Sequence, residues 1–167
     1  MNRPTSISLL VGLGFLAPVS VHGLPEDREQ PIRLEADRAQ LDQNTGVSVY
    51  EGNVIITQGS MRLFADTATI YVTEGEFERM EAKGNPVRFR YKPAADKEEI
   101  FGKGQYATYD VNAATIVVTT DAKFTQGDDV FTGEFVEYNL DKDLVKAKGG
   151  SDGGRVLFTI QPRSSRQ

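Results

Sequence analysis

Short runs of alternating apolar and polar residues, rich in β-branched and aromatic side chains, fill most of the chain after residue 30. The clearest run, residues 50–72, reads as two extended strands joined by a tight turn at Gln58-Gly59-Ser60. No segment sustains the 3.6-residue period of an amphipathic helix. Gly, Asn and Asp separate the runs as they do in β-turns. The pattern therefore predicts an all-β fold of antiparallel strands.

The chain contains this β-pattern twice. Thr57-Gln58-Gly59 returns as Thr125-Gln126-Gly127, a shift of 68 residues. The same shift relates five further pairs: Ile32 and Ile100, Ala39 and Ala107, Asp42 and Asp110, Asn44 and Asn112, and Ile56 and Phe124. Later the shift changes by a few residues, so that 80–84 corresponds to 145–149 and 87–89 to 156–158. Self-similarity of this kind predicts two repeated antiparallel halves.

The alternation changes parity once within four of the predicted strands, each time beside a small residue. In residues 32–41, for example, Leu34 and Ala36 share one face, but the next apolar pair is Ala39 and Leu41. The small residues are Ala36, Ala65, Gly104 and Gly133. A one-residue slip turns a strand inside out unless a bulge or corner compensates for it. The slips therefore predict bent strands, in a sandwich, a jelly roll or a partly open barrel.

The ends of the chain differ from this β-rich part. Arg3 precedes an apolar run at residues 7–17, and Val21-His22-Gly23 ends in a small residue. This order predicts a signal peptide at residues 1–23, cleaved after Gly23. A single domain is expected over residues 24–161, with a longer polar loop at 92–99 between its halves and a basic flexible tail at 162–167. No cysteine follows the apolar run, so no lipoprotein anchor is expected and the exported product should be soluble.

Composition excludes several classes of function. The chain has no cysteine, and its single histidine, His22, lies in the predicted signal peptide. The exported part therefore cannot form a zinc finger, a Ser-His-Asp triad or a thiol site. The formal net charge of −5 argues against a nucleic-acid-binding protein, which needs a basic surface. Neither a cofactor nor a metal is expected.

Carboxylates are the remaining candidates for chemistry. Asp37, Asp66 and Glu134 each follow the small residue of a predicted corner, and paired carboxylates can hydrolyse glycosides. We interpret them as outward-facing strand charges, because Gln105 replaces the acid in one repeat and the chain has no Trp for a sugar platform. The acidic turns at 128–129 and 141–143 have too few spaced oxygen ligands for a calcium loop.

Four segments together carry a resemblance to a known family. They are Gln30-Pro31-Ile32-x-Leu34-Glu35-Ala36-Asp37, Gly52-Asn53-Val54-Ile55-x-Thr57-Gln58-Gly59, Ala65-Asp66 and Gly84-x-Pro86. In order and spacing they resemble the periplasmic lipopolysaccharide-transport protein A family (OstA-like), from about Gln30 to Phe158. The resemblance implies a bent, V-shaped β-jelly roll that is open at both ends. It also implies a non-enzymatic periplasmic protein that binds lipopolysaccharide and passes it along an apolar groove for outer-membrane assembly.

The resemblance also implies partners and site residues. Lipid A acyl chains would lie against Ile32, Phe89, Tyr109 and Val111, which match groove positions of the family. The alternation agrees, because Val87, Phe89 and Tyr91 share one face and Arg88 and Arg90 the other. By residue type alone, ordinary core packing explains the aromatic residues equally well.

Partners would be OstA-like domains of inner-membrane and outer-membrane transport proteins, joined by edge-strand pairing, and further copies of the chain, joined head to tail. The edge residues are Ile32, Leu34 and Ala36 at one end, and Val156, Leu157 and Phe158 at the other. An unguarded apolar last strand, 156–160, favours such pairing.

Two departures from the family pattern stand out. Thr120-Asp121 occupies the place of Gly52-Asn53 in the second repeat, which predicts a differently built turn. Arg28 lies near the expected mouth of the groove, where it would face either a lipid phosphate or solvent. Two other classes stay open: an exported adhesive β-repeat scaffold without lipid cargo, and a carboxylate-dependent hydrolase.

Overall fold

The computed structural model describes residues 27–151, 153–160 and 162. The predicted signal peptide, its cleavage site and most of the basic tail lie outside these residues. In chain order the elements are η1 (Asp27–Glu29), β1 (Arg33–Glu35), β2 (Arg38–Asp42), β3 (Val47–Gln58), β4 (Met61–Thr73), β5 (Glu76–Tyr91), β6 (Ile100–Asp110), β7 (Thr115–Gln126), β8 (Asp129–Asn139), β9 (Leu144–Lys148) and β10 (Leu157–Thr159). The all-β prediction is confirmed. Within the described ranges no helix is long and apolar enough to cross a membrane.

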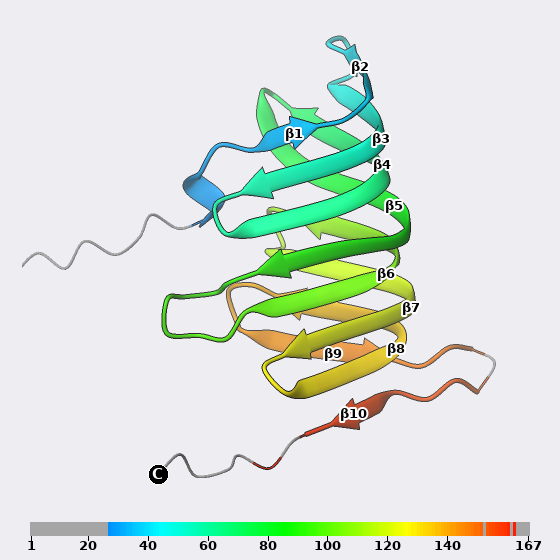
Figure 1. The fold of residues 1–167 in the computed structure, drawn as a ribbon. Helices are drawn as coiled ribbons and strands as arrows, with labels where there is room; N and C mark the ends of the chain where they lie inside the picture. The colour runs from blue at the N-terminus through cyan, green and yellow to red at the C-terminus, as the bar shows by residue number, and fades with distance from the viewer. Residues whose placement is uncertain (1–26, 152, 161, 163–167) are drawn as a thin grey trace, which may run out of the picture.

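The strands of the described residues belong to one 10-stranded antiparallel sheet. Its order is β1-β3-β4-β5-β6-β7-β8-β10, with β2 also paired to β3 and β9 also paired to β8. Because nearly every strand pairs with its neighbour in sequence, the chain descends through the stack of strands from β1 to β10 (Figure 1). The loop predicted at 92–99 connects β5 and β6.

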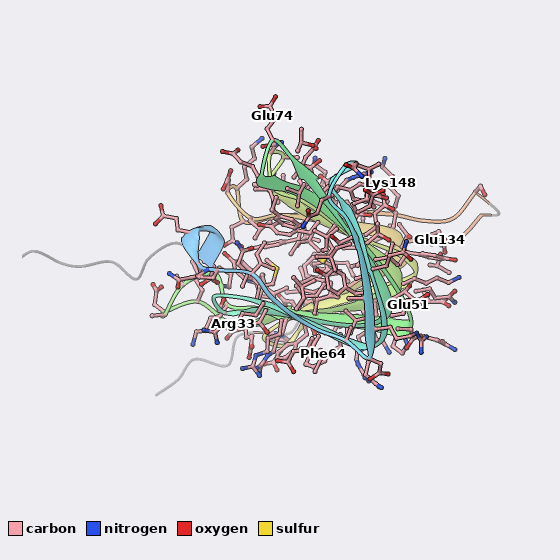
Figure 2. All side chains as sticks on the ribbon, turned by 90° about the horizontal axis from the view of Figure 1, so that it is seen from above. Arg33, Glu51, Phe64, Glu74, Glu134 and Lys148 are labelled. Atoms are coloured by element: carbon pink, nitrogen blue, oxygen red, sulfur yellow. The ribbon has the colours of Figure 1, made fainter. Side chains whose placement is uncertain are left out.

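The long strands bend along one common corner and divide the sheet into two arms. The first arm contains β1, 54–58, 61–65, 87–91, 100–104, 122–126, 129–133 and β10. The second arm contains β2, 47–51, 67–73, 76–83, 106–110, 115–119, 135–139 and β9. Figure 2, which looks along the stack, shows the arms meeting near Glu51 and diverging toward Glu74 on one side and Arg33 on the other. The predicted open, bent form is confirmed.

The corner lies where the parity of the alternation changes. Register shifts fall beside Ala65 in β4, Gly104 in β6 and Gly133 in β8, while β1 and β2 are separated at Ala36. Apolar side chains are buried on both sides of these positions, as with Leu63 and Ile70 at 3% and 6% exposure. The predicted corners are therefore confirmed, and each keeps one face of its strand turned to the interior.

The carboxylates considered for catalysis form hydrogen bonds along the outside of the corner. Asp37 Oδ2 accepts from Asn53 Nδ2 at 2.9 Å, and Asp66 Oδ2 accepts from the Asn85 main-chain N–H at 3.1 Å. Gln105 Nε2 donates to Asp121 Oδ2 at 3.5 Å, and Thr120 Oγ1 donates to Glu134 Oε1 at 3.3 Å. These exposed groups link neighbouring strands at the bend, which supports their interpretation as structural charges.

The expected difference at Thr120-Asp121 is wrong for the backbone. Gly52 and Asn53 have φ values of 81° and 47°, and Thr120 and Asp121 adopt the same left-handed conformation at 61° and 58°. A β-branched residue rarely adopts this conformation, because its Cβ approaches the neighbouring main chain. Strand pairing on both sides of β7 imposes the bend at Thr120 regardless of the residue type.

Replacement of Thr120 by Gly is expected to raise the free energy of unfolding by about 0.5–1 kcal/mol, because relief of a left-handed β-branched residue outweighs some chain entropy and the long, exposed hydrogen bond to Glu134. Urea unfolding measures the change. The matched variant Gly52→Thr should be destabilised, since a Cβ at Gly52 would lie 2.3 Å from Asp37 Oδ2. Equal stability of Thr120→Gly and the parent protein would contradict strain at this corner.

Candidate functional site

The inner faces of the two arms form one continuous apolar surface. Cross-strand register aligns Leu34, Ile56, Leu63, Phe89, Gly102, Phe124, Phe131 and Phe158 in a single row across the first arm. A parallel row crosses the second arm from Leu41 in β2 to Val145 in β9. The space between the arms is therefore lined mainly by apolar side chains from β1 to β9, and Phe158 of β10 continues the row of the first arm. This interior is the candidate functional site.

Aromatic side chains fill the middle of the interior. Phe89 packs edge-on against Phe124, with ring centroids 5.1 Å apart. Tyr138, from the second arm, lies 6.4 Å from Phe124 and 6.2 Å from Tyr91. Gly102 makes room for the Phe89 ring, because a Cβ at residue 102 would lie 2.0 Å from Phe89 Cε1. The two arms are thus held together by ring contacts where the interior is fully packed.

An apolar cavity lies nearer the β1 end of the interior. Its volume is only about 10 Å³, about the space that one water molecule needs. It is lined by Ile32, Ile56, Gln58, Met61, Leu63, Phe77, Met80 and Tyr109. Phe77 and Tyr109, both from the second arm, have ring centroids 5.9 Å apart. The main polar group of the lining is Gln58, whose side-chain Nε2 donates to the Gln30 carbonyl at 3.3 Å.

The predicted groove residues occupy three places. Ile32 and Tyr109 line the cavity together, although they come from opposite arms. Phe89 lies in the aromatic cluster at 3% exposure. Val111 is partly buried, follows β6, and packs against the core. Their contact with a cargo stays a prediction. The Arg28 side chain lies outside the described part of the structure.

Several lining residues were not singled out from the sequence. Met61, Phe77 and Met80 line the cavity, and Met61 and Met80 are 6% and 1% exposed. The alternation of β4 and β5 places them on the inner face, so periodicity carried the signal. Methionine adapts its shape readily to irregular apolar surfaces. The lining can therefore change its shape more easily than a lining of rigid side chains.

A polar contact joins the two arms on the open side of the V, at the strand ends that lie away from the corner. Lys97 lies in the loop that follows β5 on the first arm, and Asp143 lies in the turn that follows β8 on the second arm. Lys97 Nζ is 3.2 Å from Asp143 Oδ2. The Tyr138 hydroxyl also donates to Asp143, through Oδ1 at 2.9 Å. Burial, followed by this hydrogen bond, raises the pKa of Tyr138, so the phenol stays neutral at physiological pH. The ion pair is largely exposed, and such pairs contribute only about 0–1 kcal/mol.

The ends of the stack leave apolar side chains uncovered. Leu41 lies at the β2 end of an inner row but is 61% exposed, because no strand of the described chain follows it there. At the other end Leu157, Phe158 and Ile160 are 63%, 49% and 64% exposed. Phe158 stacks on Phe131 with ring centroids 4.2 Å apart. Both ends thus present main chain and apolar surface together.

Among the described residues, no group of His, Cys, Asp or Glu is arranged to hold a metal ion.

Comparisons with known proteins agree on one family. The family model described as "LptA/(LptD N-terminal domain) LPS transport protein" matches residues 33–144. The lipopolysaccharide export system protein LptH of Pseudomonas aeruginosa is 37% identical, with 100% of both chains covered. LptA of Haemophilus influenzae is 30% identical over 95% of this chain and 93% of its own.

A solved structure is similar over most of the chain. The crystal structure of Pseudomonas aeruginosa LptH, described as the LptA-homologous periplasmic component of a conserved lipopolysaccharide transport device, matches with a TM-score of 0.77. The match has 35% sequence identity and covers 83% of this chain and 100% of the other. The bent open sheet is therefore shared with that protein.

Proposed function

Because this chain belongs to the LptA/(LptD N-terminal domain) lipopolysaccharide transport family, we propose that it is a periplasmic carrier of lipopolysaccharide. It binds the acyl chains of lipid A between its arms and passes the molecule along the stack toward the outer membrane. The observation that carries the proposal is the apolar interior, continuous from β1 to β10 and bridged on its open side by a weak surface contact. No catalytic step is required, since the exposed carboxylates of the corner are engaged in linking strands.

The energetics favour hydrocarbon as the part of the cargo that is recognised. The protein has a formal net charge of −5, and lipopolysaccharide is anionic, so long-range attraction is not the source of affinity. Each buried methylene contributes about 0.8 kcal/mol, so several methylenes per chain offset the repulsion. Phe89 and Tyr109 are each 3% exposed. The acyl chains therefore reach these rings only when the two arms separate. The exposed Lys97–Asp143 pair opposes this separation only weakly.

The two ends of the stack supply the partner surfaces. A strand added beside β1 or β10 continues the sheet by main-chain hydrogen bonds, a common mode of recognition. The same addition continues the inner row of the first arm, so that Phe158 of one copy adjoins Leu34 of the next. Because the two ends differ, the contact is head to tail and extends into a bridge. Domains of the same fold in inner-membrane and outer-membrane transport proteins would cap this bridge.

A photo-crosslinking side chain at residue 89 or 109 is expected to capture lipopolysaccharide in cells, and one at residue 88 is not. Phe89 and Tyr109 face the interior, whereas Arg88 is exposed on the outer face of the same strand as Phe89. Capture is measured by the mobility shift of the protein and by antibody against lipopolysaccharide. Equal capture at residue 88 would show that cargo does not lie between the arms.

A further inference from the structure

The outer face of the first arm carries cations on a protein whose formal net charge is −5. Side chains on this face alternate with the buried ones of the interior, and most are exposed. We call its cations the basic band: Arg33, Arg62, Arg88, Arg90, Lys103 and Lys123. Glu35 is the acid among them, and Asp66, Asp121 and Glu134 follow at the corner, where each accepts one of the hydrogen bonds described above. Figure 2 shows Arg33 on the outside of its arm, pointing away from the interior.

Strand register places several of these cations directly opposite one another. Arg88 on β5 pairs with Lys103 on β6, and Lys103 pairs with Lys123 on β7. Arg62 on β4 pairs with Arg90 on β5. Cross-strand neighbours lie with Cβ atoms about 4.5–5.5 Å apart, and like charges at this distance destabilise a sheet. These facing cations therefore lower the stability of the sheet slightly, and an anion that lies against the band would relieve the repulsion.

The cations on the outer face of the second arm differ from the basic band, because they are paired. Each of them has a partner on the same arm: Arg38–Glu51 at 3.4 Å, Arg79–Glu81 at 2.8 Å, Lys146–Glu137 at 2.9 Å, and Lys83 and Lys148 over the rings of Tyr106 and Phe135. Among the described residues, Arg90 is the cation of the basic band that forms an ion pair, with Glu99 at 3.8 Å. The surplus of positive charge is thus confined to one face of the molecule.

Exposed apolar side chains lie among the cations of the band. Phe64, which pairs with Arg88, is 36% exposed, and Phe101, which pairs with Arg90, is 48% exposed. Phe64 points outward from the first arm in Figure 2. Lys and Arg reach anionic headgroups while aromatic rings enter the boundary between headgroups and acyl chains. A soluble polyanion would neutralise the cations but leave both rings exposed, whereas a bilayer surface takes up both.

We propose that the outer face of the first arm docks on a membrane surface that contains anionic phospholipids. The axis of the stack then lies along the bilayer, with the basic band on the headgroups and Phe64 and Phe101 just below them. A docked copy is therefore separate from the head-to-tail bridge proposed above, whose axis runs from one membrane to the other. The interior lies on the opposite face of the same strands and stays clear of the membrane. This function goes beyond carriage of a cargo, and it does not depend on the cargo being lipopolysaccharide.

Flotation with vesicles tests the proposal on the purified protein in its exported form. The protein is expected to float with vesicles of phosphatidylethanolamine and phosphatidylglycerol, but not with phosphatidylcholine alone, and added salt should weaken the binding. The triple variant Arg88→Gln, Lys103→Gln, Lys123→Gln should bind about 100-fold more weakly, since each cation near an anionic surface contributes about fivefold. The variant Phe64→Ala, Phe101→Ala should also bind more weakly, with the same dependence on salt.

A matched control carries the same change of charge on the other arm: Arg79→Gln, Lys83→Gln, Lys146→Gln. It should float like the parent protein. The band variant should unfold at an equal or higher temperature than the parent, because facing like charges are removed; a lower midpoint would contradict the repulsion argued above. If the triple variant does not fold, Lys103→Gln alone, with an expected loss of about fivefold, decides the question.

Three results would overturn docking by the basic band: no flotation of the parent protein with anionic vesicles, equal loss in the two triple variants, or capture of an acidic protein in place of vesicles. These vesicles contain no lipopolysaccharide. Failure here therefore leaves the proposed cargo path untouched, and failure of the photo-crosslinking test leaves membrane docking untouched.

Discussion

Replacement of Leu157 by Pro is expected to abolish end-to-end assembly and transport while leaving the binding of lipopolysaccharide intact. β10 pairs with β8 on one side and is the last strand of the sheet in the described chain. Leu157 lies opposite Thr132 of β8, and proline cannot donate to the ladder between these strands, so the strand with which a partner would pair is displaced. A single hydrogen bond contributes about 0.5–1.5 kcal/mol, about two- to tenfold in affinity, and displacement of β10 removes the other main-chain bonds of the contact as well. Leu157 itself is 63% exposed, and the interior should keep its packing.

The measurements are the mass of the protein in solution at high concentration, growth of cells that depend on the variant, and capture of lipopolysaccharide in vitro. Leu157→Thr is the matched control, because it keeps the donor and a strand-forming residue while removing the apolar side chain. It should assemble. A folded Leu157→Pro protein that assembles and supports growth like the parent would contradict pairing at β10.

A covalent bridge between the loop at 92–99 and the turn at 140–143 is expected to block uptake of lipopolysaccharide almost completely. The Lys97–Asp143 pair joins the two arms on the open side of the V, so a covalent bridge there prevents the arms from separating. The chain has no cysteine, and the pair Lys97→Cys, Lys142→Cys would supply the only thiols. This choice retains Asp143, whose Oδ1 accepts the bond from the partly buried Tyr138 hydroxyl. A short bis-alkylating reagent then closes the bridge.

Uptake is measured by photo-crosslinking at residue 89 before and after bridging. The unbridged double variant should bind within about fivefold of the parent protein, because an exposed ion pair contributes about 0–1 kcal/mol. Each single cysteine variant, treated with the same reagent, controls for alkylation. If the bridged protein takes up lipopolysaccharide as well as the unbridged one, the cargo does not enter between the arms.

Local pattern was sufficient for the strands, the faces and the corners. Val87 and Phe89 are buried and Arg88 is exposed, as the period of two predicted. The parity changes beside Ala65, Gly104 and Gly133 coincide with register shifts of the sheet. These features depend on a few adjacent residues, because side chains alternate along any strand and a bulge is a local event. The resemblance to the family, also built on short segments, named the fold correctly.

The ends of the stack show where local pattern was insufficient. Residues 32–41 were predicted as one strand, but β1 and β2 are separate, whereas the equivalent β6 is continuous. Likewise β5 is one strand, and the segments that repeat it form β9 and β10 with residues 149–156 between them. β5 and β6 are paired on both sides, and the end strands are paired on one side only. Continuity across the corner therefore depends on neighbours, and the sequence of a single strand does not contain that information.

The sequence by itself determined which residues face inward, where the strands bend and that the pattern occurs twice, since each of these follows from periodicity and turn chemistry. Tertiary structure decided the rest. It brought Ile32 and Tyr109 to one cavity, joined Lys97 to Asp143 across the open side, and aligned Arg88, Lys103 and Lys123 across three strands. Pairing on both sides also held Thr120 in a left-handed conformation that its residue type disfavours. Such contacts join residues distant in the chain, and only the register of the folded sheet brings them together.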